Sequence, residues 1–165
     1  MARRGPGAGA TPATLVLTRA GVAFSTHPYD HDPRAASYGL EAAHALGVDP
    51  GAVLKTLLAR ADEALVVGLV PVSGELDLKA LARAVGATRA RMAAPADAER
   101  ATGYVVGGIS PLGQRRTLPT VVDAGALAHE RVYVSGGRRG LDLGLAPADL
   151  VALTAASVAT LSRRS

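Results

Sequence analysis

Residues 53–70 read Val-Leu-Lys-Thr-Leu-Leu-Ala-Arg-Ala-Asp-Glu-Ala-Leu-Val-Val-Gly-Leu-Val. Two apolar runs of strand length, residues 53–59 and 65–70, flank a short polar turn, which is the pattern of a β-hairpin. The second run is apolar throughout, so we expect that strand to be buried on both faces. In the first run, the period of two places Lys55 on the same face as Leu57.

The segments on either side of this hairpin predict a mixture of helices and strands. N-capping residues, first-turn prolines and closing glycines predict helices that begin at or just after Thr11, Ser37, Asp77, Pro95 and Pro147. Further strands are expected at residues 22–27, 89–92, 120–122 and 131–134. Strands and helices do not alternate strictly, so we predict the α+β (mixed α/β) fold class on a mixed, curled sheet. The residues expected in its core are Leu57, Val66, Leu69, Val106, Val121 and Val134.

The composition fits one globular domain. The chain has 165 residues, 48% of them hydrophobic, which is enough to bury a core without a disulfide or a metal. The absence of cysteine excludes disulfides, thiolate metal sites and a cysteine nucleophile. We expect residues 1–10, rich in Gly and Ala, to form a disordered leader and residues 11–165 to form the domain. No secretory signal or membrane-spanning run is recognised, and the expected location is the cytoplasm.

The charges are balanced within the domain. The chain has 18 basic and 14 acidic residues, and four of its arginines lie at residues 3–4 and 163–164, near the ends. Without these four the two signs are equal in number, so a nucleic-acid partner has to be met by a local patch. The Arg-Arg doublets at 115–116 and 138–139 are candidates for such a patch, although paired arginines also occur in solvated loops.

Lys55 is the first candidate functional residue. Apart from Lys79 it is the only lysine in a chain that otherwise uses arginine, and it lies within an apolar strand. Burial disfavours the charge of a lysine and a nearby carboxylate restores it, and in either state the side chain can bind a phosphate or polarise a carbonyl. The alternative is a lysine at an exposed strand edge whose head group reaches water.

Two glycine-rich segments could approach a ligand closely. Residues 107–110 read Gly-Gly-Ile-Ser, and residues 135–140 read Ser-Gly-Gly-Arg-Arg-Gly, with Asp142 two residues further on. Free N–H groups of such backbone can bind an oxyanion or a phosphate. Neither segment has Walker A or dinucleotide-binding spacing, and plain glycine turns are the alternative interpretation.

The segment from His27 to Asp32 contains two histidines four residues apart. That spacing suits a zinc pair on a helix, but Pro28 and Pro33 argue against a helix, so we predict no metal site. Tyr29, one of five aromatic residues, is a candidate to line a pocket.

Several blocks of the sequence carry a family resemblance. The longest are Thr-Gly-Tyr-Val-Val-Gly-Gly-Ile-Ser-Pro-Leu-Gly-Gln at 102–114 and Tyr-Val-Ser-Gly-Gly-Arg-Arg-Gly-Leu-Asp at 133–142, and shorter ones lie at 27–33, 54–58, 76–79 and 118–123. In this order and spacing they resemble the YbaK/EbsC family, the freestanding relatives of the editing domain inserted in bacterial prolyl-tRNA synthetase. The resemblance runs from about residue 11 to the end and is greatest to the branch that deacylates Cys-tRNA(Pro).

This resemblance implies a curled, barrel-like mixed sheet flanked by helices, in a YbaK-like aminoacyl-tRNA deacylase domain. It also implies release of cysteine from the 3′ end of mischarged tRNA(Pro), by water or with help from the substrate's own thiol, and no cofactor or metal. Lys55 matches the family's essential lysine. The substrate-binding residues that the resemblance implies are Tyr29, Tyr38, Gly107 and Asp142. The two glycine-rich segments add Gly108, Ile109, Ser110, Gly136 and Gly137 to the predicted substrate-binding set. Tyr38 departs from the family pattern, where Phe is more usual.

The expected partners are the tRNA and prolyl-tRNA synthetase, with no membrane. Two other functions stay open at this point. The same fold could deacylate Ala-tRNA or Ser-tRNA with an enzyme-held water, or the chain could bind tRNA or a synthetase without catalysis. The second alternative predicts strongly salt-dependent binding and no turnover.

Overall fold

The computed structural model describes residues 9–164, so most of the expected leader lies outside the described residues. The α-helices in this range are α1 (Pro12–Ala20), α2 (Tyr38–Leu46), α3 (Leu78–Ala84), α4 (Pro95–Thr102) and α5 (Pro147–Thr154). The strands are β1 (Phe24–Pro28), β2 (Leu54–Ala61), β3 (Ala64–Pro71), β4 (Gly74–Leu76), β5 (Ala90–Met92), β6 (Thr120–Asp123), β7 (Val132–Arg138), β8 (Leu141–Leu145), β9 (Ser157–Ala159) and β10 (Ser162–Arg164). Short 3-10 helices η1 (Pro50–Ala52) and η2 (Ala124–Ala128) precede β2 and follow β6.

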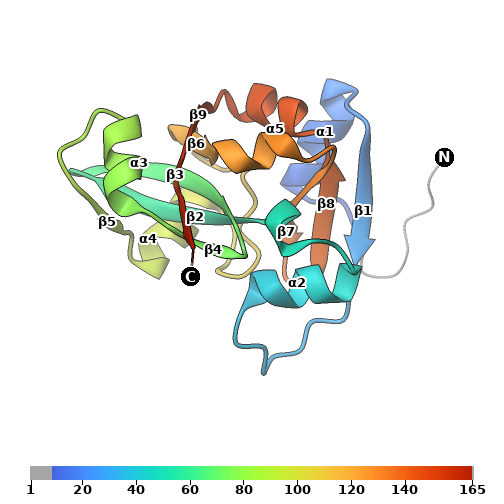
Figure 1. The fold of residues 1–165 in the computed structure, drawn as a ribbon. Helices are drawn as coiled ribbons and strands as arrows, with labels where there is room; N and C mark the ends of the chain where they lie inside the picture. The colour runs from blue at the N-terminus through green and yellow to red at the C-terminus, as the bar shows by residue number, and fades with distance from the viewer. Residues whose placement is uncertain (1–8, 165) are drawn as a thin grey trace.

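The strands form three sheets, and the mixed α+β class is confirmed (Figure 1). The largest sheet has the order β5-β2-β3-β6-β9, with antiparallel pairing on the β5 side and parallel pairing from β3 to β9. The second sheet is the antiparallel set β1-β8-β7, and the third is the pair β10-β4. The central hairpin of β2 and β3 is the one expected from residues 53–70.

The expected barrel-like curl is not supported. The five-stranded sheet ends at β5 and β9, the three-stranded sheet ends at β1 and β7, and neither closes on itself. In the described part of the chain, an isolated bridge between Val53 and Tyr133 joins the two sheets. The 3-10 helix η1 directly precedes β2, so β2 does not extend alongside β7 beyond that bridge.

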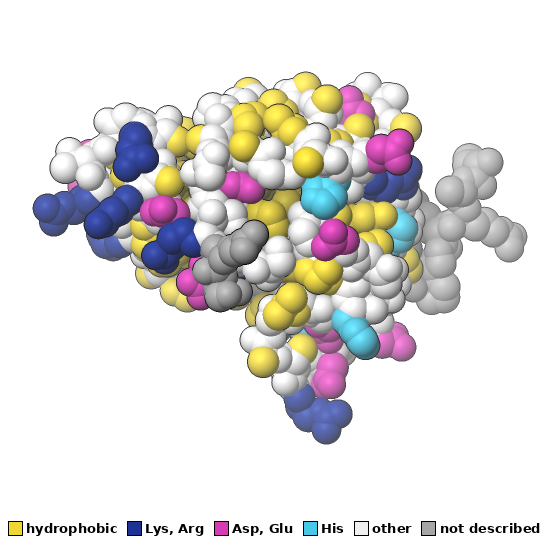
Figure 2. All heavy atoms as spheres, in the orientation of Figure 1, with side chains coloured by type: hydrophobic (Ala, Val, Ile, Leu, Met, Phe, Trp, Pro, Cys, Tyr) yellow, Lys and Arg dark blue, Asp and Glu magenta, His cyan; other side chains and the backbone are white. Residues whose placement is uncertain are grey.

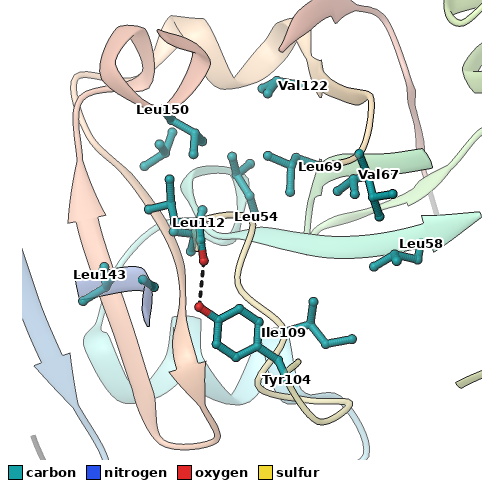
Figure 3. Close-up of a cluster of buried hydrophobic side chains, with 14 of the residues drawn as sticks. Leu54, Leu58, Val67, Leu69, Tyr104, Ile109, Leu112, Val122, Leu143 and Leu150 are labelled. Atoms are coloured by element: carbon teal, nitrogen blue, oxygen red, sulfur yellow. Dashed lines mark hydrogen bonds between the residues drawn. The ribbon is translucent and has the colours of Figure 1, made fainter. Parts of the chain in front are cut away.

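Two layers of core cover the two faces of the five-stranded sheet. The larger cluster is shared with the three-stranded sheet and α5, and contains Leu69, Leu143 and Leu150, all 0% exposed (Figure 3). The second cluster lies under α3. Consecutive residues of β2 pack in different clusters: Leu58 belongs to the first and Ala59 to the second. This alternation is what a strand buried on both faces requires.

The expected core is confirmed at four of its six positions: Val66, Leu69, Val121 and Val134. Leu57 and Val106 are only partly buried, because both face the cavity described below. The sequence analysis missed β4, β8, β9 and β10. Three of these, β4, β9 and β10, are three residues long, and so short a run shows little periodicity.

The predicted ends of α1 and α2 are confirmed by their caps. Thr11 and Thr14 form a capping box at the start of α1, and the Ser37 hydroxyl accepts a hydrogen bond from the N–H of Leu40 at the start of α2. Gly21 and Gly47 end these helices with φ of 69° and 67°, a conformation that glycine adopts without strain. These caps fix where Tyr38, the first residue of α2, enters the site.

No helix among residues 9–164 is long and apolar enough to cross a membrane. On the face shown in Figure 2, Lys and Arg side chains gather at the end of the molecule where α3 and β5 lie. The basic and acidic residues are therefore balanced in number over the domain but unevenly distributed over its surface.

The segment between α4 and β6 has no helix or strand, and the side chain of Tyr104 holds it in place. Tyr104 is 5% exposed, and its hydroxyl donates a 2.7 Å hydrogen bond to the carbonyl of Leu112 (Figure 3). Burial raises the pKa of Tyr104 to about 12, so the phenol keeps its proton. This bond spans the glycine-rich residues 107–110.

We expect Tyr104→Phe to destabilise the protein by about 1–3 kcal/mol, because the buried Leu112 carbonyl loses its partner. Urea unfolding measures this change. Tyr38→Phe is the matched control, since the Tyr38 ring is 38% exposed and no hydrogen bond from its hydroxyl is found among the described residues. Equal stabilities of the Tyr104→Phe variant and the parent would contradict the role of this bond.

Candidate functional site

A cavity of about 420 Å³ lies between α2, β2, the start of α4 and the glycine segment. Six of the ten residues predicted for the site line it: Tyr29, Tyr38, Lys55, Gly107, Ile109 and Asp142. Its volume falls in the range of small-molecule sites, and its lining is mostly apolar with a few polar groups.

The cavity follows an unpaired edge of β2. β3 pairs with β2 along its whole length, whereas β5 pairs only with Ala59–Ala61. The segment Leu54–Leu58 therefore has a strand neighbour on one side only, and each of its residues lines the cavity. This edge explains why residues from both faces of β2, Lys55 and Thr56 among them, meet in one space.

Lys55 and Thr56 bring unpaired polar groups to the cavity. Lys55 is partly buried, and among the described residues its ammonium group has no ion pair or hydrogen bond. The hydroxyl of Thr56 is buried and also lacks a partner within that range. Buried polar groups are normally paired, so both side chains are available to a ligand. The sequence analysis did not select Thr56 as a site residue, although its position next to Lys55 could have indicated it.

Arg139 fixes the start of the glycine segment. Its Nε and an Nη atom donate hydrogen bonds of 2.9 and 2.7 Å to the carbonyl of Val106, and its guanidinium lies 5.1 Å from the centre of the Tyr38 ring. Gly107 follows with φ of 90°, and a Cβ there would lie 2.9 Å from Arg139 and 3.0 Å from Tyr38. Only glycine fits between them without strain. The sequence marked Arg139 as a possible phosphate contact and not as a support for this turn.

The glycine segment offers two unused N–H groups. In the described chain no hydrogen bond uses the N–H of Gly107 or of Ile109, and both residues line the cavity. Gly108 differs, because its N–H donates to the carbonyl of Val105. Ser110 is 0% exposed, and its hydroxyl accepts a hydrogen bond from the N–H of Leu112. Gly108 and Ser110 thus hold the turn, and the expectation that they line the cavity is not met.

The second glycine pair also lies outside the cavity lining, although Gly136 and Gly137 were predicted to bind the substrate. Gly136 and Gly137 belong to β7, at an irregularity between Ser135 and Arg138. A Cβ on Gly136 would come within 2.6 Å of Leu141, and one on Gly137 within 2.8 Å of the Tyr104 ring. These glycines allow close packing, and Ser135 is the residue of this segment that faces the cavity.

Asp142 is the buried charge of the site. It lies on β8 opposite Ser135, is 5% exposed, and its carboxylate has no hydrogen bond within residues 9–164. Burial raises its pKa to about 7. The pKa of Tyr29 is raised to about 12, mainly by burial and to a smaller extent by the negative charges of Asp142 and Glu41. The cavity therefore presents a carboxyl group that changes charge near neutral pH.

The two histidines considered for zinc have separate partners. His27 lies 2.7 Å from the hydroxyl of Ser25, and burial followed by the charge of Arg131 lowers the pKa of His27. His31 lies 2.8 Å from a carboxylate oxygen of Glu41 at the base of α2. These contacts direct the two rings to different sites.

The family model of the aminoacyl-tRNA editing domain matches residues 32–153. EbsC of Enterococcus faecalis, provisionally named a Cys-tRNA(Pro)/Cys-tRNA(Cys) deacylase, is 38% identical over 113 residues, which are 68% of this chain and 69% of EbsC. A crystal structure provisionally described as a trans-editing enzyme for prolyl-tRNA synthetase has a TM-score of 0.82 at 29% identity, covering 92% of this chain and 95% of its own. The structure of hypothetical protein APE2540 has a TM-score of 0.83 at 27% identity, with 93% and 100% covered.

This chain therefore belongs to the aminoacyl-tRNA editing family of the YbaK/EbsC type, as the resemblance predicted.

Asp142→Asn should stabilise the protein increasingly as the pH rises. Between pH 4 and 7 the folded chain keeps a proton on Asp142 that the unfolded chain releases, so this group lowers stability as pH rises and has a constant effect above 7. In urea unfolding, the free energy of unfolding of the variant minus that of the parent should be larger at pH 8 than at pH 5 by about 2–3 kcal/mol. Glu75→Gln, at an exposed carboxylate, controls for the lost charge. A pH-independent difference would argue against the raised pKa.

Proposed function

We propose that this chain removes cysteine from mischarged Cys-tRNA(Pro) by cleaving the aminoacyl ester at the tRNA 3′ end. The observation that carries the proposal is the cavity itself, in which an unpaired lysine, a buried carboxyl group and two unused backbone N–H groups converge. The family membership supports ester cleavage on tRNA, and the likeness to EbsC supports cysteine as the amino acid.

Each of these groups has a chemical role in the proposal. The N–H groups of Gly107 and Ile109 hold the ester carbonyl oxygen as negative charge develops on it. The carboxylate of Asp142 receives the α-ammonium group of the amino acid, which supplies the opposite charge that the buried carboxylate lacks. Lys55 binds the phosphate or ribose region of the terminal adenosine, with the Thr56 hydroxyl beside it.

The attacking group in this proposal comes from the substrate. The sulfur of the cysteine forms a bond to its own carbonyl carbon, the bond from that carbon to the ribose 3′ oxygen breaks, and the thiol proton ends on that oxygen. The products are the free tRNA end and a cyclic thioester, which water then opens to cysteine. The enzyme contributes orientation and charge stabilisation. The Ser110 hydroxyl, buried and bonded to Leu112, does not serve as a nucleophile in this scheme.

Substrate discrimination tests this scheme. Cys-tRNA(Pro) should be deacylated much faster than Ala-tRNA(Pro) or Ser-tRNA(Pro), because neither alanine nor serine carries a thiol. Equal rates on Cys-tRNA(Pro) and Ala-tRNA(Pro) would replace the thiol mechanism with a water mechanism. Salt-dependent tRNA binding without any deacylation would leave a binding module instead of an enzyme.

Lys55→Ala should reduce deacylation of Cys-tRNA(Pro) on the order of 10²–10³-fold, because the variant removes one preorganised electrostatic interaction with the substrate. Lys55→Arg should also lose most activity, since the planar guanidinium is larger and fixes its donors in a fork. Thermal unfolding should change little, because Lys55 has no protein partner among the described residues. Lys79→Ala, at the exposed lysine of α3, is the matched control. A folded Lys55→Ala variant within a few-fold of the parent would sink the assignment.

Arg139→Ala should lower kcat more than it raises KM, on the order of tenfold, because the Val106 carbonyl loses two charge-assisted hydrogen bonds and Gly107 loses its fixed orientation. Arg139→Lys retains one donor and should recover part of kcat. Steady-state kinetics on Cys-tRNA(Pro) separates these effects. A rise in KM alone would instead make Arg139 a substrate contact.

A further inference from the structure

A smaller hollow of about 190 Å³ lies on the other side of α4 from the cavity described above, here called the cleft. Ala98 of α4 lines the cleft, whereas Asp97, Arg100 and Ala101 of the same helix line the hollow. The hollow, here called the arginine hollow, is lined by Arg60, Leu65, Asp97, Arg100, Ala101 and Arg116. It combines residues from β2, β3, α4 and the segment that follows the glycine turn.

The arginine hollow carries an excess of positive charge. Asp97 is its only carboxylate among the described residues, and both oxygens are engaged, one by Arg60 at 3.2 Å and the other by Arg100. A second guanidinium nitrogen of Arg60 donates to the carbonyl of Glu63. Three guanidinium groups against one carboxylate give the lining of the hollow an excess of two positive charges. The guanidinium of Arg116 has no hydrogen bond or ion pair within residues 9–164.

The backbone fixes the position of this free arginine. The N–H groups of Arg115 and Arg116 donate hydrogen bonds of 2.9 and 3.0 Å to the carbonyls of Thr102 and Ala101 in the last turn of α4. The backbone of Arg116 is therefore fixed by hydrogen bonds, and its free guanidinium lines the same hollow as Arg100, whose side chain is 72% exposed. Guanidinium groups bind phosphate in a two-pronged geometry, so the arrangement suits a phosphodiester.

The distance from the cleft suits a nucleic-acid strand. Arg60 follows Lys55 by five residues on β2, which corresponds to roughly 17 Å along a strand. A tRNA ends in four unpaired nucleotides, which span roughly 14 Å when stacked at about 3.4 Å each. We propose that the arginine hollow binds the sugar-phosphate backbone of the tRNA near the junction of its single-stranded end and its acceptor stem. This inference rests on the proposed function, with the aminoacyl end in the cleft.

The test compares two substrates with the double variant Arg100→Ala/Arg116→Ala. Arg60 is left intact because it also bonds the Glu63 carbonyl. On Cys-tRNA(Pro) the KM should rise at least about fivefold, and the slope of log KM against log salt should fall by roughly 0.7–0.9 for each phosphate that the variant no longer binds. On 3′-O-cysteinyl-adenosine, which has no backbone phosphate, KM should be unchanged. Arg83→Ala, at an exposed arginine of α3 on the opposite face of the sheet, is the matched control.

Three results would overturn the inference: an unchanged KM and salt slope on Cys-tRNA(Pro), an equal rise in KM on both substrates, or an equal effect of Arg83→Ala. If the parent protein cleaves neither substrate, the proposed function fails. The arginine hollow is then tested by measuring the binding of tRNA(Pro) that carries no amino acid, with fluorescence anisotropy as the readout over the same salt range. Equal affinity of the parent and the double variant in that assay rejects the hollow as a phosphate site.

Discussion

Between Leu54 and Leu58, strand β2 has a neighbouring strand on one side only, and the site depends on this missing partner. A paired strand in that position would fill the space that the cavity occupies. An unpaired edge leaves backbone groups that have to be met by water, by a covering segment or by a ligand. Here α2, the start of α4 and the glycine segment surround the edge without pairing with it. The sheet thus supplies a rigid wall, and less regular segments supply the rest of the cavity.

The irregular wall of the cavity is held by a few specific contacts. Tyr104 ties the glycine segment to Leu112 inside the core, and Arg139 ties its first residues to β7 and to Tyr38. Gly107 fits in the space left between Arg139 and Tyr38. A segment without helix or strand is normally mobile, so such contacts are what keep its N–H groups in a fixed direction. The two unused N–H groups are therefore held in fixed directions at the cavity.

Electrostatics divides the molecule into two unlike sites. Inside the cleft, Asp142 is buried without a partner, at a cost in stability that a bound cationic group would offset. Outside it, around α4, guanidinium groups outnumber carboxylates in an open hollow. An aminoacyl-tRNA carries both complements, an ammonium group at its end and phosphates along its strand. One helix, α4, borders both sites, which places them on neighbouring parts of the surface.

Short stretches of sequence were enough to predict the central hairpin, the capped helices and the mixed fold class, and to select Lys55, Gly107 and Asp142 as candidates that the structure places in the cavity lining. These features are local, because apolar periodicity, capping residues and motif spacing are written within short stretches. Tertiary structure decided the rest. It left the sheets open where η1 precedes β2, packed Gly136 against Leu141, and paired Arg139 with the Val106 carbonyl. Such outcomes depend on which distant residues meet, and the pairing of sheet edges and the close approach of backbones are not encoded in any single stretch of sequence.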